Sequence, residues 1–264
     1  MDRLYFFESY LFSIINRSVA ALKIFPYFEV MKYLLLPVLI LIGQVEIFSQ
    51  APAIELLDKS IAYHDPDDRW KKWAPELPFT VVFPGKPDTE RWVSYDNKKG
   101  SFLFRANYPE GDLIYKVEKG SEVSVLWNDS AEIPEKVAEQ YRISKDRALM
   151  YRDYYTYLYG MPMKLNDPGT NIHPEVSTIT KEGVPYKKIK VSYEESIGKD
   201  IWYFYFDPIT SALKAYQFFK DESKNDGEFI LFEGEIIKDG IRIPKDRKWF
   251  YNVDGKYLAT DVLQ

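Results

Sequence analysis

Hydrophobic residues change their spacing several times along the chain, and each change predicts a different element. Between residues 51 and 63, Ile54, Leu57 and Ile61 recur every three to four positions, which predicts an amphipathic helix. The segment His64-Asp65-Pro66-Asp67-Asp68 ends this helix, because a proline keeps the preceding residue out of helical backbone. We therefore expect one helix at the start of the folded region, followed by a polar turn.

Beyond Phe79 the spacing shortens to a period of two, which is typical of strands with one buried face. Glycine, proline, aspartate and asparagine interrupt this pattern at short, even intervals, which predicts an antiparallel meander. The candidate strands are Phe79–Phe83, Glu90–Tyr95, Ser101–Asn107, Leu113–Lys119 and Glu122–Trp127.

A helical block interrupts the strands. Pro134 lies near its start, where the missing N–H of proline costs no hydrogen bond. Gly160, followed by Pro162, marks its end, and residues 166–174 are expected to form a loop. The apolar face of this block repeats every three to four residues, at Ala148, Tyr151, Tyr155 and Leu158.

The second strand region is centred on two aromatic runs, Ile201–Phe206 and Leu213–Phe219, joined by a turn that begins Asp207-Pro208. Such runs predict a hairpin, and aromatic residues on both of its faces place it centrally in a sheet with other elements packed over it. Asp-Gly steps add further hairpin signals. The remaining strands are expected at Glu175–Thr180, Tyr186–Tyr193, Glu228–Ile237, Arg242–Tyr251 and Tyr257–Val262.

These elements predict the α+β class, with a curved antiparallel sheet carrying helices on its concave face. We see no internal repeat and no linker rich in Ser, Gly or Pro, so residues 51–264 are expected to form a single domain.

The first fifty residues have a different pattern. Met31-Lys32 precedes an apolar run of about ten residues, which is the layout of a secretory signal and is too short for a comfortable membrane span. We therefore interpret residues 31–50 as a signal peptide and expect the protein in the periplasm or secreted. Residues 1–30 are then an upstream mis-start, with a disordered or amphipathic segment as the alternative.

Composition excludes several classes of function. The chain of 264 residues contains no cysteine, which rules out disulfides, thiolate metal sites and a cysteine nucleophile. Its net charge of −5 provides no basic surface for nucleic acid. Nucleic acid is therefore not an expected partner, and the expected partners are an apolar small molecule or lipid and other envelope proteins.

The candidate chemistry is sparse. His64, Asp65 and the pair Asp67-Asp68 would suit a hydrolase or metal-dependent enzyme if they met a distant carboxylate such as Asp207 or Asp221. A polar helix end explains the same residues more simply. With two histidines and no phosphate-binding or nucleophile motif, the sequence favours a non-enzymatic role without a cofactor or metal.

Aromatic residues are denser than a core requires. A tyrosine-rich helix facing an aromatic hairpin is expected either to fill the interior or to line an apolar cavity. The cavity interpretation predicts a protein that binds or carries a lipid or acyl chain, and the filled interior predicts a structural envelope protein. The candidate ligand-binding residues are Tyr151, Tyr154, Tyr155, Tyr159, Trp202, Phe204, Tyr216, Phe218 and Trp249.

Several longer motifs resemble the DUF6503 family of uncharacterised exported bacterial proteins. The resemblance spans most of Ile54 to Leu263, excludes residues 1–50 and implies no known activity. The motifs that carry it are Ala62-Tyr63-His64-Asp65-Pro66, Met150-Tyr151 with Tyr154 to Leu165, Asp167-Pro168-Gly169-Thr170 and Gly198 to Glu228.

The strand–turn–strand from Trp202 to Phe219 is also similar to the LolA-like outer-membrane lipoprotein carriers. That resemblance implies a half-barrel wrapped around helices with a cavity for acyl chains. It transfers no individual functional residue, so the lipid cavity rests on analogy of fold.

Overall fold

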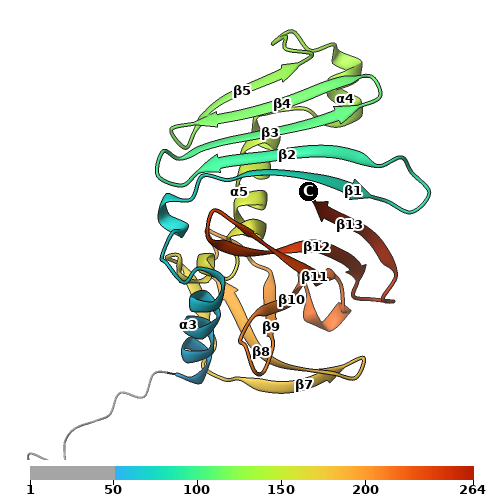
Figure 1. The fold of residues 1–264 in the computed structure, drawn as a ribbon. Coiled ribbons are helices and arrows are strands. Elements are labelled where there is room, and N and C mark those ends of the chain that lie inside the picture. Colours follow the sequence, from blue (N-terminus) through green and yellow to red (C-terminus); the bar gives the residue numbers. More distant parts are fainter. Residues whose placement is uncertain (1–50) are drawn as a thin grey trace, which may run out of the picture. The chain divides into compact units, whose positions relative to one another are not determined.

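The computed structural model describes residues 51–264. The expected signal at residues 31–50 and the segment before it lie outside the described residues. Figure 1 shows the strands in order, from β5 at one end to β7 at the other. Among the described residues, no helix is long and apolar enough to cross a bilayer.

The described chain forms one antiparallel sheet of 13 strands, in the order β5-β4-β3-β2-β1-β13-β12-β11-β10-β9-β8-β6, with β7 also paired to β8. The first meander is as the alternating pattern predicts. Its strands are β1 (Glu76–Val82), β2 (Thr89–Asp96), β3 (Ser101–Tyr108), β4 (Gly111–Glu118) and β5 (Glu122–Trp127).

The second group of strands follows the helices and matches the predicted aromatic runs. Its strands are β6 (Thr170–Ile172), β7 (Ser177–Lys181), β8 (Val184–Tyr193), β9 (Ile201–Phe206), β10 (Leu213–Phe219), β11 (Glu228–Lys238), β12 (Ile241–Tyr251) and β13 (Tyr257–Leu263). The first and last strands, β1 and β13, join the two groups through the register Phe79↔Leu263 to Val82↔Thr260.

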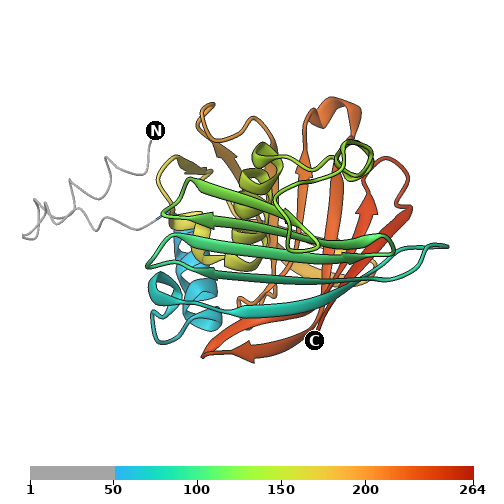
Figure 2. The same ribbon diagram turned by 90° about the horizontal axis from the view of Figure 1, so that it is seen from above.

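The sheet bends but does not close. Seen from above, β1–β5 and β8–β12 lie on two sides of the helix α5 (Lys145–Gly160) (Figure 2). This arrangement confirms the predicted α+β class with a curved antiparallel sheet. The other helices are α3 (Pro52–His64) and α4 (Glu135–Tyr141), with short turns η1 (Trp70–Lys72), η2 (Met163–Asn166) and η3 (Glu222–Lys224).

Helix α5 ends at Gly160, where its sequence predicts, but the predicted helical block is divided, because α4 ends at Tyr141 and α5 begins only at Lys145. The Ser144 Oγ accepts a hydrogen bond from the Arg147 N–H at 3.0 Å, which satisfies one of the free donors of the first turn. At the other end, a Cβ on Gly160 would come within 2.6 Å of the Trp70 ring. The helix therefore ends in a close contact that only glycine allows without displacing its neighbours.

Two other expectations about the fold differ from the structure. The segment 166–174, expected to be a loop, contains β6, which pairs with β8 from Thr170↔Tyr193 to Ile172↔Val191. Three residues are too few to show an alternating pattern. The hairpin β9–β10 is internal to the sheet, between β8 and β11, but the β1–β13 pair lies nearer the middle of the strand order.

Candidate ligand cavity

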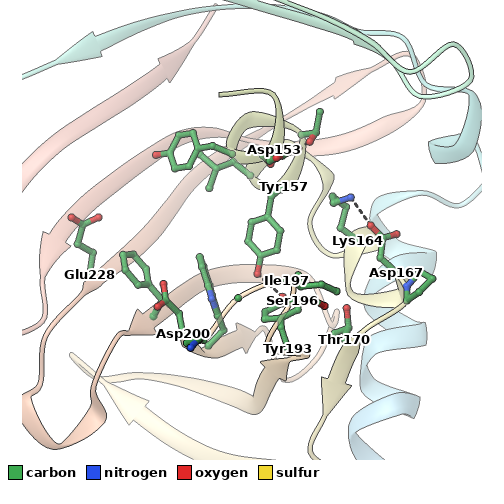
Figure 3. A pocket seen from close by; sticks show the side chains of 18 of the residues that line it. Asp153, Tyr157, Lys164, Asp167, Thr170, Tyr193, Ser196, Ile197, Asp200 and Glu228 are labelled. Carbon is green, nitrogen blue, oxygen red and sulfur yellow. Dashed lines mark hydrogen bonds and ion pairs between the residues drawn. The ribbon is translucent and has the colours of Figure 1, made fainter. Parts of the chain in front are cut away.

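A cavity of about 700 Å³ opens to solvent beside α5. One wall is the helix, through Asp153, Tyr154, Thr156, Tyr157 and Leu158. The opposite wall consists of the ends of β8–β12, and two connecting segments, residues 164–170 and 196–200, complete the cavity (Figure 3). The volume falls in the range of roughly 300–1,000 Å³ that is typical of small-molecule sites.

Strand register decides which aromatic side chains reach this cavity. Trp202, Phe218 and Glu228 lie directly opposite one another on β9, β10 and β11, and all three line the cavity. Two residues away on each strand, on the same face of the sheet, a second row is fully buried. It consists of Phe204, Tyr216 and Ile230. The cavity therefore lies over the outer row, and the inner row belongs to the core.

Tyr157 connects the two walls. Its hydroxyl lies 2.6 Å from the Tyr193 hydroxyl on β8, and its ring meets the Trp202 ring edge to face at 5.0 Å. Burial raises the pKa of both Tyr157 and Tyr193, so both hydroxyls stay protonated. Figure 3 shows the Tyr157 side chain extending from α5 toward Tyr193 across the cavity. The pair joins α5 to β8 at a point where both residues line the cavity.

The nine candidate residues divide between two environments. Tyr154, Trp202, Phe218 and Trp249 line the cavity, and Tyr154 stacks on Trp249 with ring centres 6.3 Å apart. The others pack away from it. These are Tyr151, Tyr155, Tyr159, Phe204 and Tyr216.

The helix tyrosines that do not line the cavity fill the core. The Tyr155 ring lies 5.6 Å from that of Phe79 on β1 and 5.5 Å from that of Phe104 on β3, and only 3% of Tyr155 is exposed. Arg247 is buried, and its guanidinium carbon lies over the Tyr159 ring, 4.1 Å from the centre of that ring. One face of α5 is therefore solid core, while another faces the cavity.

Sequence reasoning missed several cavity residues. Tyr157 lies three positions after Tyr154, so the two share a helix face, and this spacing was the available signal. Asp200 and Glu228 come from a loop and a strand end whose meeting depends on strand register. No local pattern predicts that pairing.

His64 and Asp65 have structural partners. His64 is 1% exposed, and its Nε2 accepts a hydrogen bond from the Leu213 N–H at 3.0 Å. Its Nδ1 therefore carries the proton and donates it to the Arg242 carbonyl at 2.7 Å. Burial lowers the pKa of His64. Asp65 accepts hydrogen bonds from the N–H groups of Arg69 and Trp70, both at 2.8 Å.

The carboxylates proposed to join His64 are also engaged in turns. Asp207 accepts from the Ile209 and Thr210 N–H groups, which lowers its pKa, and Asp221 accepts from the N–H of Ser223. Within residues 51–264, no group of three or more His, Cys, Asp or Glu side chains is placed to hold a metal ion. The convergence that the hydrolase alternative requires is therefore not found in this part of the chain.

Comparison with known families gives a match along most of the sequence. The profile described as "Family of unknown function (DUF6503)" matches residues 31–263. The chain belongs to the DUF6503 family. The match begins earlier than the resemblance seen in the sequence, which excluded residues 31–50. No curated protein sequence matches this DUF6503 chain.

Solved structures similar to this DUF6503 protein have very different sequences. A LolA superfamily protein from Nitrosomonas europaea shares 10% identity, with a TM-score of 0.48 over 80% of this chain and 91% of that one. A DUF1329 family protein from Desulfovibrio piger shares 11% identity, with a TM-score of 0.40 over 81% of this chain and 91% of that one.

Proposed function

We propose that this DUF6503 protein binds an apolar ligand, such as the acyl chain of a lipid or lipoprotein, in the cavity beside α5. The observation that supports this function is the set of aromatic side chains facing an open volume of about 700 Å³. Each methylene buried there contributes about 0.8 kcal/mol, so a chain of moderate length gains enough to bind.

The ligand is expected to enter past the connecting segments and not by movement of the helix. Tyr155 and Tyr159 fix α5 in the core, so displacing the helix would break the contacts of both rings. The segment 196–200 forms a wall of the cavity, and Ile197 there is 57% exposed. Opening at this segment disturbs much less buried surface.

We also infer that the carrier works in the cell envelope, since residues 31–50 have the layout of a secretory signal. Sequencing the N-terminus of the exported protein tests this inference. Cleavage near Ala51 is expected, and a mature protein that begins near Met1 would contradict it.

Ligand binding is tested on protein purified without detergent. Mass spectrometry of an organic extract is expected to reveal bound lipid, and the emptied protein is expected to take up a fluorescent fatty acid. Trp202→Ala should weaken that uptake about 10-fold or more, because it removes a large aromatic contact. Absence of both extracted lipid and probe uptake would remove the proposed function.

Two further variants make the test specific to the cavity. Tyr203→Ala is the matched control, because Tyr203 follows Trp202 on β9 but its hydroxyl donates to Glu222 at 2.5 Å outside the cavity. It should leave uptake unchanged. Gly198→Trp adds bulk at a cavity-lining position where a Cβ would meet no atom within 4 Å, and it should reduce uptake without unfolding the protein.

A further inference from the structure

The charges around the cavity do not balance. Its lining includes four carboxylates, Asp153, Asp167, Asp200 and Glu228, but only two lysines, Lys164 and Lys199. An apolar site has no need of ionised groups, since burying a charge without a partner costs free energy. The arrangement of these groups therefore bears on what the ligand carries besides its apolar part.

Most of these charged groups already have partners. Lys164 forms an ion pair with Asp167, and Lys199 with Glu195 at 2.6 Å. The Asp153 carboxylate lies 2.7 Å from the Arg152 Nε. Figure 3 shows Asp200 and Glu228 well away from the Lys164–Asp167 pair.

Asp200 and Glu228 are the exception. Among residues 51–264, neither forms an ion pair within 4.0 Å, although Lys220 attracts both from a greater distance. Each is partly buried, and burial raises the pKa of each carboxyl. A cation brought into the cavity would offset this desolvation.

Aromatic residues are the neighbours of these two acidic residues in the strand register and in the sequence. Glu228 is directly opposite Phe218 in the β10–β11 register, and Asp200 lies two residues before Trp202. The Trp202 and Phe218 rings stack on each other with centres 5.0 Å apart, and Tyr157 meets Trp202 at the same separation. Aromatic faces next to carboxylates are the surroundings in which ammonium groups bind well.

We propose that the ligand carries a positive charge, an amine or quaternary ammonium next to its apolar chain, which Asp200, Glu228 and the neighbouring rings receive. This inference rests on the proposed function, because it specifies the head group of the ligand for the same cavity. A fatty acid carboxylate would instead meet unpaired negative charge, while both cavity lysines already have partners.

Three probes with the same chain test the head group. Dodecyltrimethylammonium, dodecanol and dodecanoate, each below its micelle concentration, compete with an uncharged fluorescent fatty alcohol for the emptied protein. The ammonium is expected to bind about fivefold or more tightly than dodecanol, and dodecanoate more weakly than both. If dodecanol and dodecanoate bind while the ammonium does not, this inference falls and the apolar cavity stands. If none of the three binds, the proposed function itself falls.

Charge-removing variants locate the effect. Asp200→Asn and Glu228→Gln should each weaken the ammonium about fivefold while leaving dodecanol unchanged. Glu175→Gln is the matched control, since it removes one negative charge at an exposed position outside the cavity lining. It should change ammonium binding less than twofold. An equal loss in all three variants would show a general effect of net charge and overturn the assignment to Asp200 and Glu228.

Discussion

Two faces of α5 carry the same type of residue in opposite environments. Tyr155 packs into the β1–β4 side, where the rings of Phe79, Phe104 and Tyr151 surround it. Tyr154 and Tyr157, on the side of β9–β12, border an open cavity. The difference lies in the strands opposite, so a high density of tyrosine indicates neither a core nor a binding site by itself.

The largest expected difference in stability is between variants of two phenylalanines, one on each side of α5. Phe104→Ala should lower the free energy of unfolding by about 3–5 kcal/mol, because it leaves a hole in a fully buried cluster. Phe218→Ala should cost less than about 2 kcal/mol, since its ring already borders open space. Urea unfolding of both variants measures the difference. Equal losses would show that the β9–β11 side is packed as tightly as the other.

The next effect concerns His64, which fastens α3 to β10 and β12. His64→Ala should lower the free energy of unfolding by about 2–4 kcal/mol, because two buried backbone groups lose their partner. His173→Ala, at an exposed position, should cost little and serves as the control.

The same residue makes stability depend on pH. The folded protein lowers the pKa of His64 below its ordinary value of 6.5, so the unfolded chain binds the proton more readily. The contribution of His64 is therefore fully present above pH 6.5 and is lost as the pH falls below it. Thermal unfolding between pH 7 and 5 should show this loss in the wild type and in His173→Ala, but not in His64→Ala.

A smaller effect is expected for the hydroxyl pair that connects the cavity walls. Tyr157→Phe and Tyr193→Phe should each cost about 1 kcal/mol, and the double variant should cost little more than either one. A double-mutant cycle of unfolding free energies measures the coupling. Fully additive losses would mean that the two hydroxyls do not interact.

The smallest expected effect concerns a lysine that covers an aromatic ring on the outer side of the sheet. On the side away from α5, Phe229 belongs to a cluster that includes Tyr186 and Tyr205. The Lys181 ammonium lies 3.5 Å from the centre of the Phe229 ring. Lys181→Met keeps the apolar stem and should cost about 0.5 kcal/mol, the contribution of the charge over the ring. Lys181→Ala should cost more, because the stem also covers Phe229. Chemical unfolding of both variants separates the two contributions.

The sequence was sufficient for most elements of the fold. The runs Ile201–Phe206 and Leu213–Phe219 became β9 and β10 with the predicted bounds, since each is marked by its own composition and by the turn at Asp207. That turn depends on local hydrogen bonds from Asp207 to Ile209 and Thr210. Residues 170–172 were not predicted as a strand, because only their partner β8 makes them one.

The cavity was much harder to predict than the elements that surround it. Trp202 and Phe204 have similar chemistry on the same face of β9, yet one lines the cavity and the other is 0% exposed. What separates them is the position along the strand at which the open volume begins. That position depends on contacts between distant segments, which the spacing of residues within one segment does not encode.

The pairing of β1 with β13 has a consequence for how the protein is made. Phe79 lies directly opposite Leu263, and the Gln264 N–H donates to the Pro78 carbonyl at 2.9 Å, so the two halves of the sheet become continuous only once β13 has been synthesised. Until then the β1 edge has no neighbour on that side and is open to pairing with other chains. Contacts between such distant residues form slowly, which makes β13 the strand whose arrival completes assembly.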